Sequence, residues 1–137
     1  MNFQQLDSTD QKLVEAAKAV LQKNYHPIRH TVGAAVLCSS GNIYTGINIE
    51  ACGYGPCAEP IAIGAAFTKG EREILAIAAV CKQGDEYAVL SPCGNCRQLL
   101  MDYASEAMVI FNHDGNILKT QVRNLLPGAY ISDFDDV

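Results

Sequence analysis

Three cysteines and one glutamate have the residue types and spacing of a catalytic metal site. Glu59 follows Cys57 by two positions, and Cys93 and Cys96 lie in the segment PCGNC that begins at Pro92. Three thiolates fill three corners of the tetrahedron that Zn²⁺ prefers and leave the fourth for water, as in a catalytic zinc site. Glu59 could move protons for that water. We therefore expect one Zn²⁺ per chain, held by the three cysteines, with Glu59 as the catalytic residue.

The same residues allow other interpretations. Two cysteines separated by two residues are also typical of a redox dithiol or of a zinc-binding protein without catalysis. Glu59 could be a solvated carboxylate in the first turn of a helix. A closed structural zinc site needs a fourth protein ligand, and no residue has the spacing for one. Cys57 and Glu59 together favour the catalytic site. The remaining cysteines lie in or near apolar segments and are predicted to be small buried residues: Cys38, Cys52 and Cys81.

Two predicted helices place the cysteines at helix starts. The first covers residues 57–68, and the second covers residues 94–103 with Leu99, Leu100 and Tyr103 on its inner face. Free N–H groups and the helix dipole at such starts lower a thiol pKa and favour the thiolate that binds zinc. Arg97 could add positive charge by donating to a thiolate. The pattern therefore predicts that the two helix starts lie side by side.

The rest of the chain supplies a sheet to carry these helices. A helix is predicted over residues 9–23, capped by Asp7 or Ser8 and ended by the His26-Pro27 step. Strands are predicted at residues 32–38, 43–48, 74–81, 107–111 and 117–120, with 87–90 a short extension and 122–126 a helical turn. This alternation predicts an α/β fold in one domain, residues 1–137, with three α/β/α layers and a central mixed sheet of about five strands.

Composition and charge restrict the class of partner. The chain has 137 residues, 49% of them hydrophobic and 18% charged, and a net charge of −5. A net negative charge argues against a nucleic-acid polymer as the substrate, because phosphate binding depends on basic residues. The N-terminal residues have no apolar signal segment, and no apolar run is long enough to cross a membrane. We expect a cytoplasmic protein with reduced cysteines and no membrane partner.

Several motifs together resemble the cytidine deaminases of the small homotetrameric type. They are VGAA from Val32, GINIE from Gly46, CAE from Cys57, PCGNCRQ from Pro92 and LLPGAY from Leu125. The zinc deaminases carry a His or Cys followed by x-Glu and later Pro-Cys-x-x-Cys, with the glutamate not a ligand. The resemblance covers nearly the whole chain. It implies hydrolytic deamination of a free cytosine nucleoside, cytidine or deoxycytidine, to its uracil counterpart with release of ammonia.

The same resemblance implies roles for further residues. Asn48 and Glu50 would bind the sugar hydroxyls, and Tyr130 would cover the pyrimidine. Active sites are shared between subunits in this family, and Tyr54 and Tyr130 would cross to a neighbouring subunit of the homotetramer. The carbonyl of Ser91, before Pro92, could accept from the exocyclic amine of the base. The N–H of Ala58 or the carbonyl of Cys57 could also bind the edge of the base.

Three positions depart from the family pattern. Pro60 stands where the family has an arginine bonded to the zinc thiolates, and His30 stands where it often has a phenylalanine that stacks on the base. Ala51 replaces an asparagine after Glu50. The blasticidin S deaminases share the GPCAE segment and also lack that arginine, and they act on an aminoacyl cytosine nucleoside. Pro60 favours this second hypothesis, whereas Asn48 and Glu50 favour an ordinary nucleoside, and both remain open on sequence.

Overall fold

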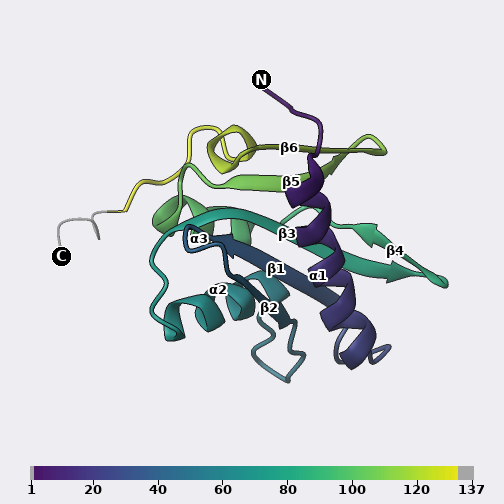
Figure 1. Cartoon of the computed structure of the whole chain (residues 1–137). Helices are drawn as coiled ribbons and strands as arrows, with labels where there is room; N and C mark the ends of the chain where they lie inside the picture. The colour runs from purple at the N-terminus through teal and green to yellow at the C-terminus, as the bar shows by residue number, and fades with distance from the viewer. Residues whose placement is uncertain (1, 133–137) are drawn as a thin grey trace.

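The computed structural model describes residues 2–132, which fold around one six-stranded mixed sheet. Its elements in chain order are α1 (Ser8–Asn24), β1 (Val32–Cys38), β2 (Ile43–Ile47), α2 (Ala58–Thr68), β3 (Ile74–Gln83), β4 (Glu86–Val89), α3 (Gly94–Tyr103), β5 (Met108–His113), β6 (Asn116–Gln121) and the 3-10 helix η1 (Val122–Leu125). The strand order is β2-β1-β3-β5-β6, and β4 pairs with β3 beside this path (Figure 1). Strands β3 and β5 are parallel and the other pairs are antiparallel.

Helices cover both faces of this sheet, which confirms the predicted three-layer architecture (Figure 1). On one face, α1 packs Leu13, Ala17 and Leu21 against β1 and β3. On the other face, α2 and α3 contribute Ala62 and Leu100 to a second apolar cluster. The two helices that carry the cysteines therefore share one face of the sheet.

The sheet has one strand more than the sequence indicated. The segment predicted as an extension at residues 87–90 is β4, and it forms an antiparallel hairpin with β3 in which Gln83 pairs with Glu86. Gly84 in the turn has a φ of +63°, a conformation that glycine adopts without strain. The hairpin lengthens β3 by two residues beyond the predicted end at Cys81. Only Gly84 and Asp85 separate the two strands, and a turn of two residues leaves little signal in the sequence.

Two glycines allow helices to approach the sheet closely. A Cβ on Gly46 of β2 would lie 2.5 Å from the backbone nitrogen of Ala62 in α2. A Cβ on Gly33 of β1 would collide with the carbonyl oxygen of Ala17 in α1, on the opposite face. Because neither position has room for a side chain, the docking of α1 and α2 depends on these glycines.

Local predictions hold at several element ends and fail at two side chains. Asp7 is the N-cap of α1 and forms a capping box with Asp10. The predicted bounds of β1 and α3 are confirmed. Tyr103 was predicted to point inward, but it is 62% exposed and its ring lies 5.2 Å from that of Phe67. Cys38 is buried as predicted and Cys81 is half-buried, whereas Cys52 is exposed, so its prediction was wrong.

Within residues 2–132, no helix combines the length and apolarity that a membrane crossing requires.

Candidate metal centre

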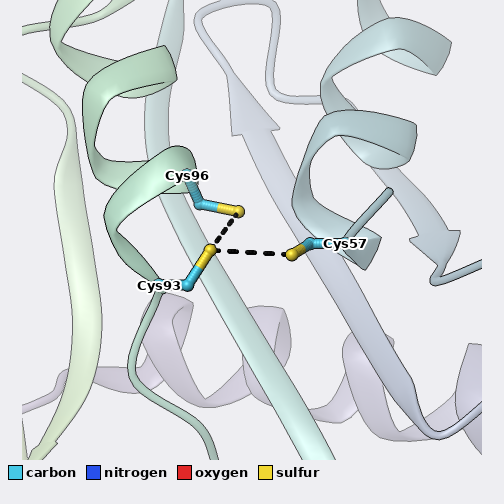
Figure 2. Close-up of side chains that lie close together, drawn as sticks. All are labelled: Cys57, Cys93 and Cys96. Carbon is cyan, nitrogen blue, oxygen red and sulfur yellow. Dashed lines mark hydrogen bonds between the residues drawn. The ribbon is translucent and has the colours of Figure 1, made fainter. Parts of the chain in front are cut away.

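The three predicted ligands meet at the starts of two helices. Cys57 is the N-cap of α2, Cys93 is the N-cap of α3, and Cys96 lies in the first turn of α3. Their Sγ atoms point toward one another from the two helices (Figure 2). The Sγ atom of Cys93 is 3.6 Å from that of Cys57 and 3.6 Å from that of Cys96, and all three lie within 4.8 Å of one another.

This spacing fits a tetrahedral zinc ion. With Zn–S bonds of about 2.3 Å, two sulfur ligands of a tetrahedron lie roughly 3.8 Å apart. The two separations of 3.6 Å are close to that edge, and the third pair, Cys57 and Cys96, lies within 4.8 Å. Sulfur ligands also match the preference of zinc. Cys57, Cys93 and Cys96 would therefore hold Zn²⁺, and one coordination position would remain for water or substrate.

The surroundings of the three thiols differ in their effect on ionisation. Burial alone would raise the pKa of Cys93, but backbone N–H groups of Cys96 and Asn95 and the neighbouring thiols lower that pKa on balance. Burial, followed by the neighbouring Cys93 thiol, raises the pKa of Cys57. Burial and then the charge of Glu59 raise the pKa of Cys96 strongly. Three thiols this close cannot all ionise without a cation between them, so metal binding must release protons here.

Glu59 lies beside the thiols and is shielded from solvent. It is the second residue of α2 and only 4% exposed. Burial raises the pKa of its carboxyl group, and its own backbone N–H and the Cys96 thiol offset part of this rise. A buried carboxyl group beside a metal site can exist both protonated and ionised during a reaction, which is what a proton carrier requires.

Arg97 has different partners from the predicted one. Its Nε donates to the carbonyl of Pro92 at 2.9 Å, and its Nη1 donates to the carbonyl of Leu125 at 2.8 Å. These bonds differ from the prediction that Arg97 donates to a thiolate, because its guanidinium donates to two carbonyl oxygens instead. Arg97 thereby connects Pro92, the residue before Cys93, to Leu125 at the end of η1. Pro60 lies in the first turn of α2, where a proline fits because the helix needs no N–H there.

A second group of predicted residues gathers after β2. Asn48 is 4% exposed, and its Oδ1 accepts from the backbone N–H groups of Thr31 at 2.7 Å and Val32 at 3.0 Å. Its Nδ2 lies 3.4 Å from Oε1 of Glu50. The ring Nδ1 of His30 lies 2.9 Å from the carbonyl oxygen of Asn48. The structure thus brings Asn48, Glu50 and His30 together, but the polar partner of His30 is main chain.

The remaining predicted site residues lie apart or make backbone contacts. Tyr54 and Tyr130 are both 73% exposed, and the carbonyl of Tyr130 accepts from Nε2 of Gln98 at 2.9 Å. The Ser91 hydroxyl bonds the backbone N–H and carbonyl of Asn112 at 3.0 and 3.2 Å. Ala58 is buried as the first residue of α2.

One residue near the second group was missed from sequence. Nη1 of Arg29 donates to the carbonyl of Glu50 at 2.9 Å across a separation of 21 residues. Only the proximity of Arg29 to His30 in the chain could have drawn attention to it. No local pattern identifies a long side chain that binds a distant carbonyl oxygen.

A three-cysteine metal centre with an adjacent buried glutamate, in a three-layer α/β/α fold, defines the class of zinc-dependent deaminases. Residues 7–112 match the family model for the cytidine and deoxycytidylate deaminase zinc-binding region. With more than half of its length matched, the chain belongs to this family.

Curated relatives and solved structures agree with the family match. The chain is 36% identical to a blasticidin-S deaminase from Bacillus cereus, with 91% of this chain and 94% of that protein covered. It is 38% identical to a cytidine deaminase from Sporosarcina psychrophila, with 88% and 90% covered. Its fold matches the crystal structure of a cytidine deaminase from Mycobacterium tuberculosis with a TM-score of 0.74 and 34% identity, over 90% of this chain and 98% of that one.

Proposed function

We propose that this protein is a hydrolase that deaminates a free cytosine nucleoside, cytidine or deoxycytidine, to uridine or deoxyuridine. The observation that carries this proposal is the convergence of three Sγ atoms within 4.8 Å beside a glutamate that is 4% exposed. The net charge of −5 favours a free nucleoside over a polymer. The named activities of the cytidine deaminase relatives support the same substrate class.

The reaction replaces the amine at C4 of the ring with oxygen from water. One water is consumed, a C4–O bond forms, the C4–N bond breaks and nitrogen leaves as ammonia. Zn²⁺, when bound by the three thiolates, supplies Lewis-acid activation of that water. The Glu59 carboxylate carries both protons of that water in turn: it takes the first and delivers it to N3 of the ring, then takes the second from the new hydroxyl on C4 and delivers it to the departing amine. Its burial beside the thiols keeps bulk water from competing for these protons.

Residues around the metal centre would orient the base. The carbonyl of Ser91 is the proposed acceptor for the exocyclic amine, and its hydroxyl bonds to Asn112 fix the position of Ser91. The N–H of Ala58 and the carbonyl of Cys57 are the proposed partners of the base edge. Asn48 and Glu50 would bind the sugar, because an amide donor and a carboxylate acceptor complement neighbouring hydroxyl groups.

A specific feature favours a second candidate, the deamination of blasticidin S or another modified cytosine nucleoside. Gly55 and Pro56 precede Cys57, as in the blasticidin S deaminases, and Pro60 stands in place of the family arginine, which those deaminases also lack. The Bacillus cereus relative bears that name and matches most of the chain. The lost arginine removes a positive charge that would neutralise the thiolates.

We further propose a homotetramer in the cytoplasm that serves pyrimidine salvage. The exposure of Tyr54 and Tyr130 supports active sites completed by a neighbouring subunit, because both rings are 73% exposed in the single chain. Three of the six cysteines are the proposed zinc ligands, which must be reduced thiolates to bind the metal, and a reducing compartment keeps them in that form. Light scattering gives the subunit number. Mixing inactive Glu59→Gln protein with Tyr130→Ala protein restores activity only if subunits share their sites.

The test compares three substrates on one zinc-loaded sample. The loss of ultraviolet absorbance is followed with cytidine, deoxycytidine and blasticidin S, and the zinc content is measured on the same protein. Turnover of cytidine and deoxycytidine supports the first proposal, and turnover of blasticidin S alone supports the second. A fully loaded protein that acts on none of the three would refute the first proposal and exclude blasticidin S, which leaves another modified cytosine nucleoside as the substrate of the second.

A further inference from the structure

We propose that His30, assisted by Arg29, is a positioning residue that holds the main chain of residues 48–50 so that Asn48 and Glu50 can bind the sugar of the substrate. This inference rests on the proposed function. It gives His30 a role different from that of the phenylalanine that often stacks on the base at this position in the family. The argument depends on three sets of hydrogen bonds.

The loop of residues 26–30, which carries His30, is held by hydrogen bonds between its own residues. The backbone N–H of His26 donates to the carbonyl of His30 at 3.0 Å, and the N–H of His30 donates back to His26 at 3.2 Å. Nδ1 of His26 accepts from the N–H groups of Ile28 at 3.2 Å and Arg29 at 3.1 Å. Four hydrogen bonds within five residues fix the backbone of this loop. Side chains that leave it therefore start from a defined position.

Two side chains from this loop reach the main chain after β2. Nδ1 of His30 lies 2.9 Å from the carbonyl oxygen of Asn48, and Nη1 of Arg29 donates to the carbonyl of Glu50 at 2.9 Å. Because a carbonyl oxygen can only accept, Nδ1 of His30 must carry the proton. The two bonds hold the first and last carbonyl groups of residues 48–50, which follow β2. They therefore fix both the position and the twist of residues 48–50.

The Asn48 side chain is oriented by the same junction. Its Oδ1 accepts from two backbone N–H groups, at 2.7 Å from Thr31 and 3.0 Å from Val32. Two donors on one oxygen fix the amide orientation, so Nδ2 lies 3.4 Å from both Oγ1 of Thr31 and Oε1 of Glu50. A substrate hydroxyl that replaces one of these two long contacts meets only a donor on Asn48, and Glu50 offers only acceptors. This pairing suits the hydroxyl groups of a sugar, which both donate and accept.

A substitution at His30 should therefore weaken binding of the sugar without changing the chemical step. Phenylalanine, the residue common at this position in the family, has no donor for the Asn48 carbonyl. His30→Phe should loosen residues 48–50 and leave the cysteines and Glu59 untouched. His30→Asn keeps a donor on the γ carbon, at the place of the imidazole Nδ1, and should restore much of the bond. His113→Phe is the matched control, since His113 lies on β5 and packs its ring on Phe3.

The kinetic experiment compares cytidine with 2′,3′-dideoxycytidine, which lacks both hydroxyl groups. Loss of one hydrogen bond should raise KM for cytidine about threefold to tenfold in His30→Phe. The kcat for cytidine, the zinc content and the KM or inhibition constant of the dideoxy compound should stay near the values of unmutated protein. His30→Asn and His113→Phe should resemble unmutated protein. Equal losses on both compounds, or no change on either, would overturn the proposal.

A second readout does not depend on activity. Nitrogen-15 NMR of the unmutated protein should show His30 as the tautomer protonated at Nδ1. Hydrogen exchange at the amides of residues 48–50 should become faster in His30→Phe and not in His113→Phe. A proton on Nε2 alone, or unchanged exchange, would refute the positioning role even in an active enzyme. If the zinc-loaded protein deaminates no cytosine nucleoside, the proposed function fails, and these two measurements still decide whether His30 holds the segment.

Discussion

The contact between Gly46 and α2 offers a direct test of how packing supports the metal centre. In Gly46→Ala the new Cβ would lie 2.5 Å from the backbone nitrogen of Ala62 and 2.9 Å from the Cβ of Ile61. Ordinary contact begins at 3.4 Å, so α2 must move away by 0.9 Å (3.4 − 2.5). The nearest atom belongs to the backbone, and no change of rotamer can relieve the contact.

The expected loss follows from this displacement. Overpacking of a core costs about 1–3 kcal/mol, and a backbone clash belongs at the upper end of that range. For a chain of this size, a loss of about 3 kcal/mol lowers Tm by roughly 10 °C. The same movement carries Cys57, the N-cap of α2, away from its place 3.6 Å from Cys93. Zinc affinity should fall on the order of tenfold to a hundredfold, as when ligand orientation is disturbed.

Urea unfolding and zinc competition titration measure these two effects. Gly64→Ala is the matched control on the same helix, because a Cβ there meets nothing within 4 Å in the chain. Alanine is the better helix former, so this variant should gain about 0.5–1 kcal/mol at equal protein concentration. If Gly46→Ala had the stability of unmutated protein, the inference that α2 packs too closely on β2 to admit a side chain at Gly46 would be wrong. A loss of stability with unchanged zinc affinity would refute the link between packing and the metal centre.

Three further variants test the centre and one polar cluster. Glu59→Gln should keep its fold and zinc but lose about 10²- to 10⁴-fold in kcat, and near-normal turnover would exclude the proton-carrier role. Cys93→Ala should lose zinc and melt at a lower temperature, because metal binding is linked to folding; full zinc content with an unchanged Tm would contradict the ligand assignment. Glu71 accepts from Ser40 at 2.7 Å and Tyr44 at 2.8 Å, and these bonds lower its pKa below 4.5. Its charged form therefore stabilises the fold above the unfolded pKa, and this contribution is lost as pH falls through the lowered pKa. Unfolding scans from pH 7 to pH 3 should show Glu71→Gln less stable at neutral pH and the difference closing in acid; a difference independent of pH would disprove this.

Short-range signals predicted most of the architecture. The turn at Ser40-Gly41-Asn42 joins β1 to β2, which lie where two strands were predicted, and Asp7 caps α1 as predicted. The cysteine spacing predicted a cluster because Cys57 and Cys93 both begin helices, and a helix start fixes the direction of its first side chains. These features depend on residues within one turn of a helix or one hairpin. They can be recognised without knowledge of the rest of the chain.

Predictions about distant partners were less successful. Arg97 is drawn to the carbonyl of Leu125, 28 residues away, rather than to the thiolates four or fewer positions before it. His30 finds the Asn48 carbonyl across 18 residues. A carbonyl oxygen is present at every residue, so sequence holds no information about which one a long polar side chain will meet. Only the packed fold selects the partner.

The arrangement of the two cysteine helices would give a bound metal a structural as well as a catalytic effect. Helix α2 packs mainly on β1 and β2, whereas α3 packs on η1, and the backbones of the two helices approach each other at few residues. Cys57 belongs to the first of these units, and Cys93 and Cys96 belong to the second. A cation held by all three would therefore join two helices whose other contacts are apolar, through the cluster that includes Ala62 and Leu100 and through the rings of Phe67 and Tyr103. The position of Glu59 relative to Cys93 would then depend on the metal ligands, and the same three cysteines would set the geometry needed for proton transfer.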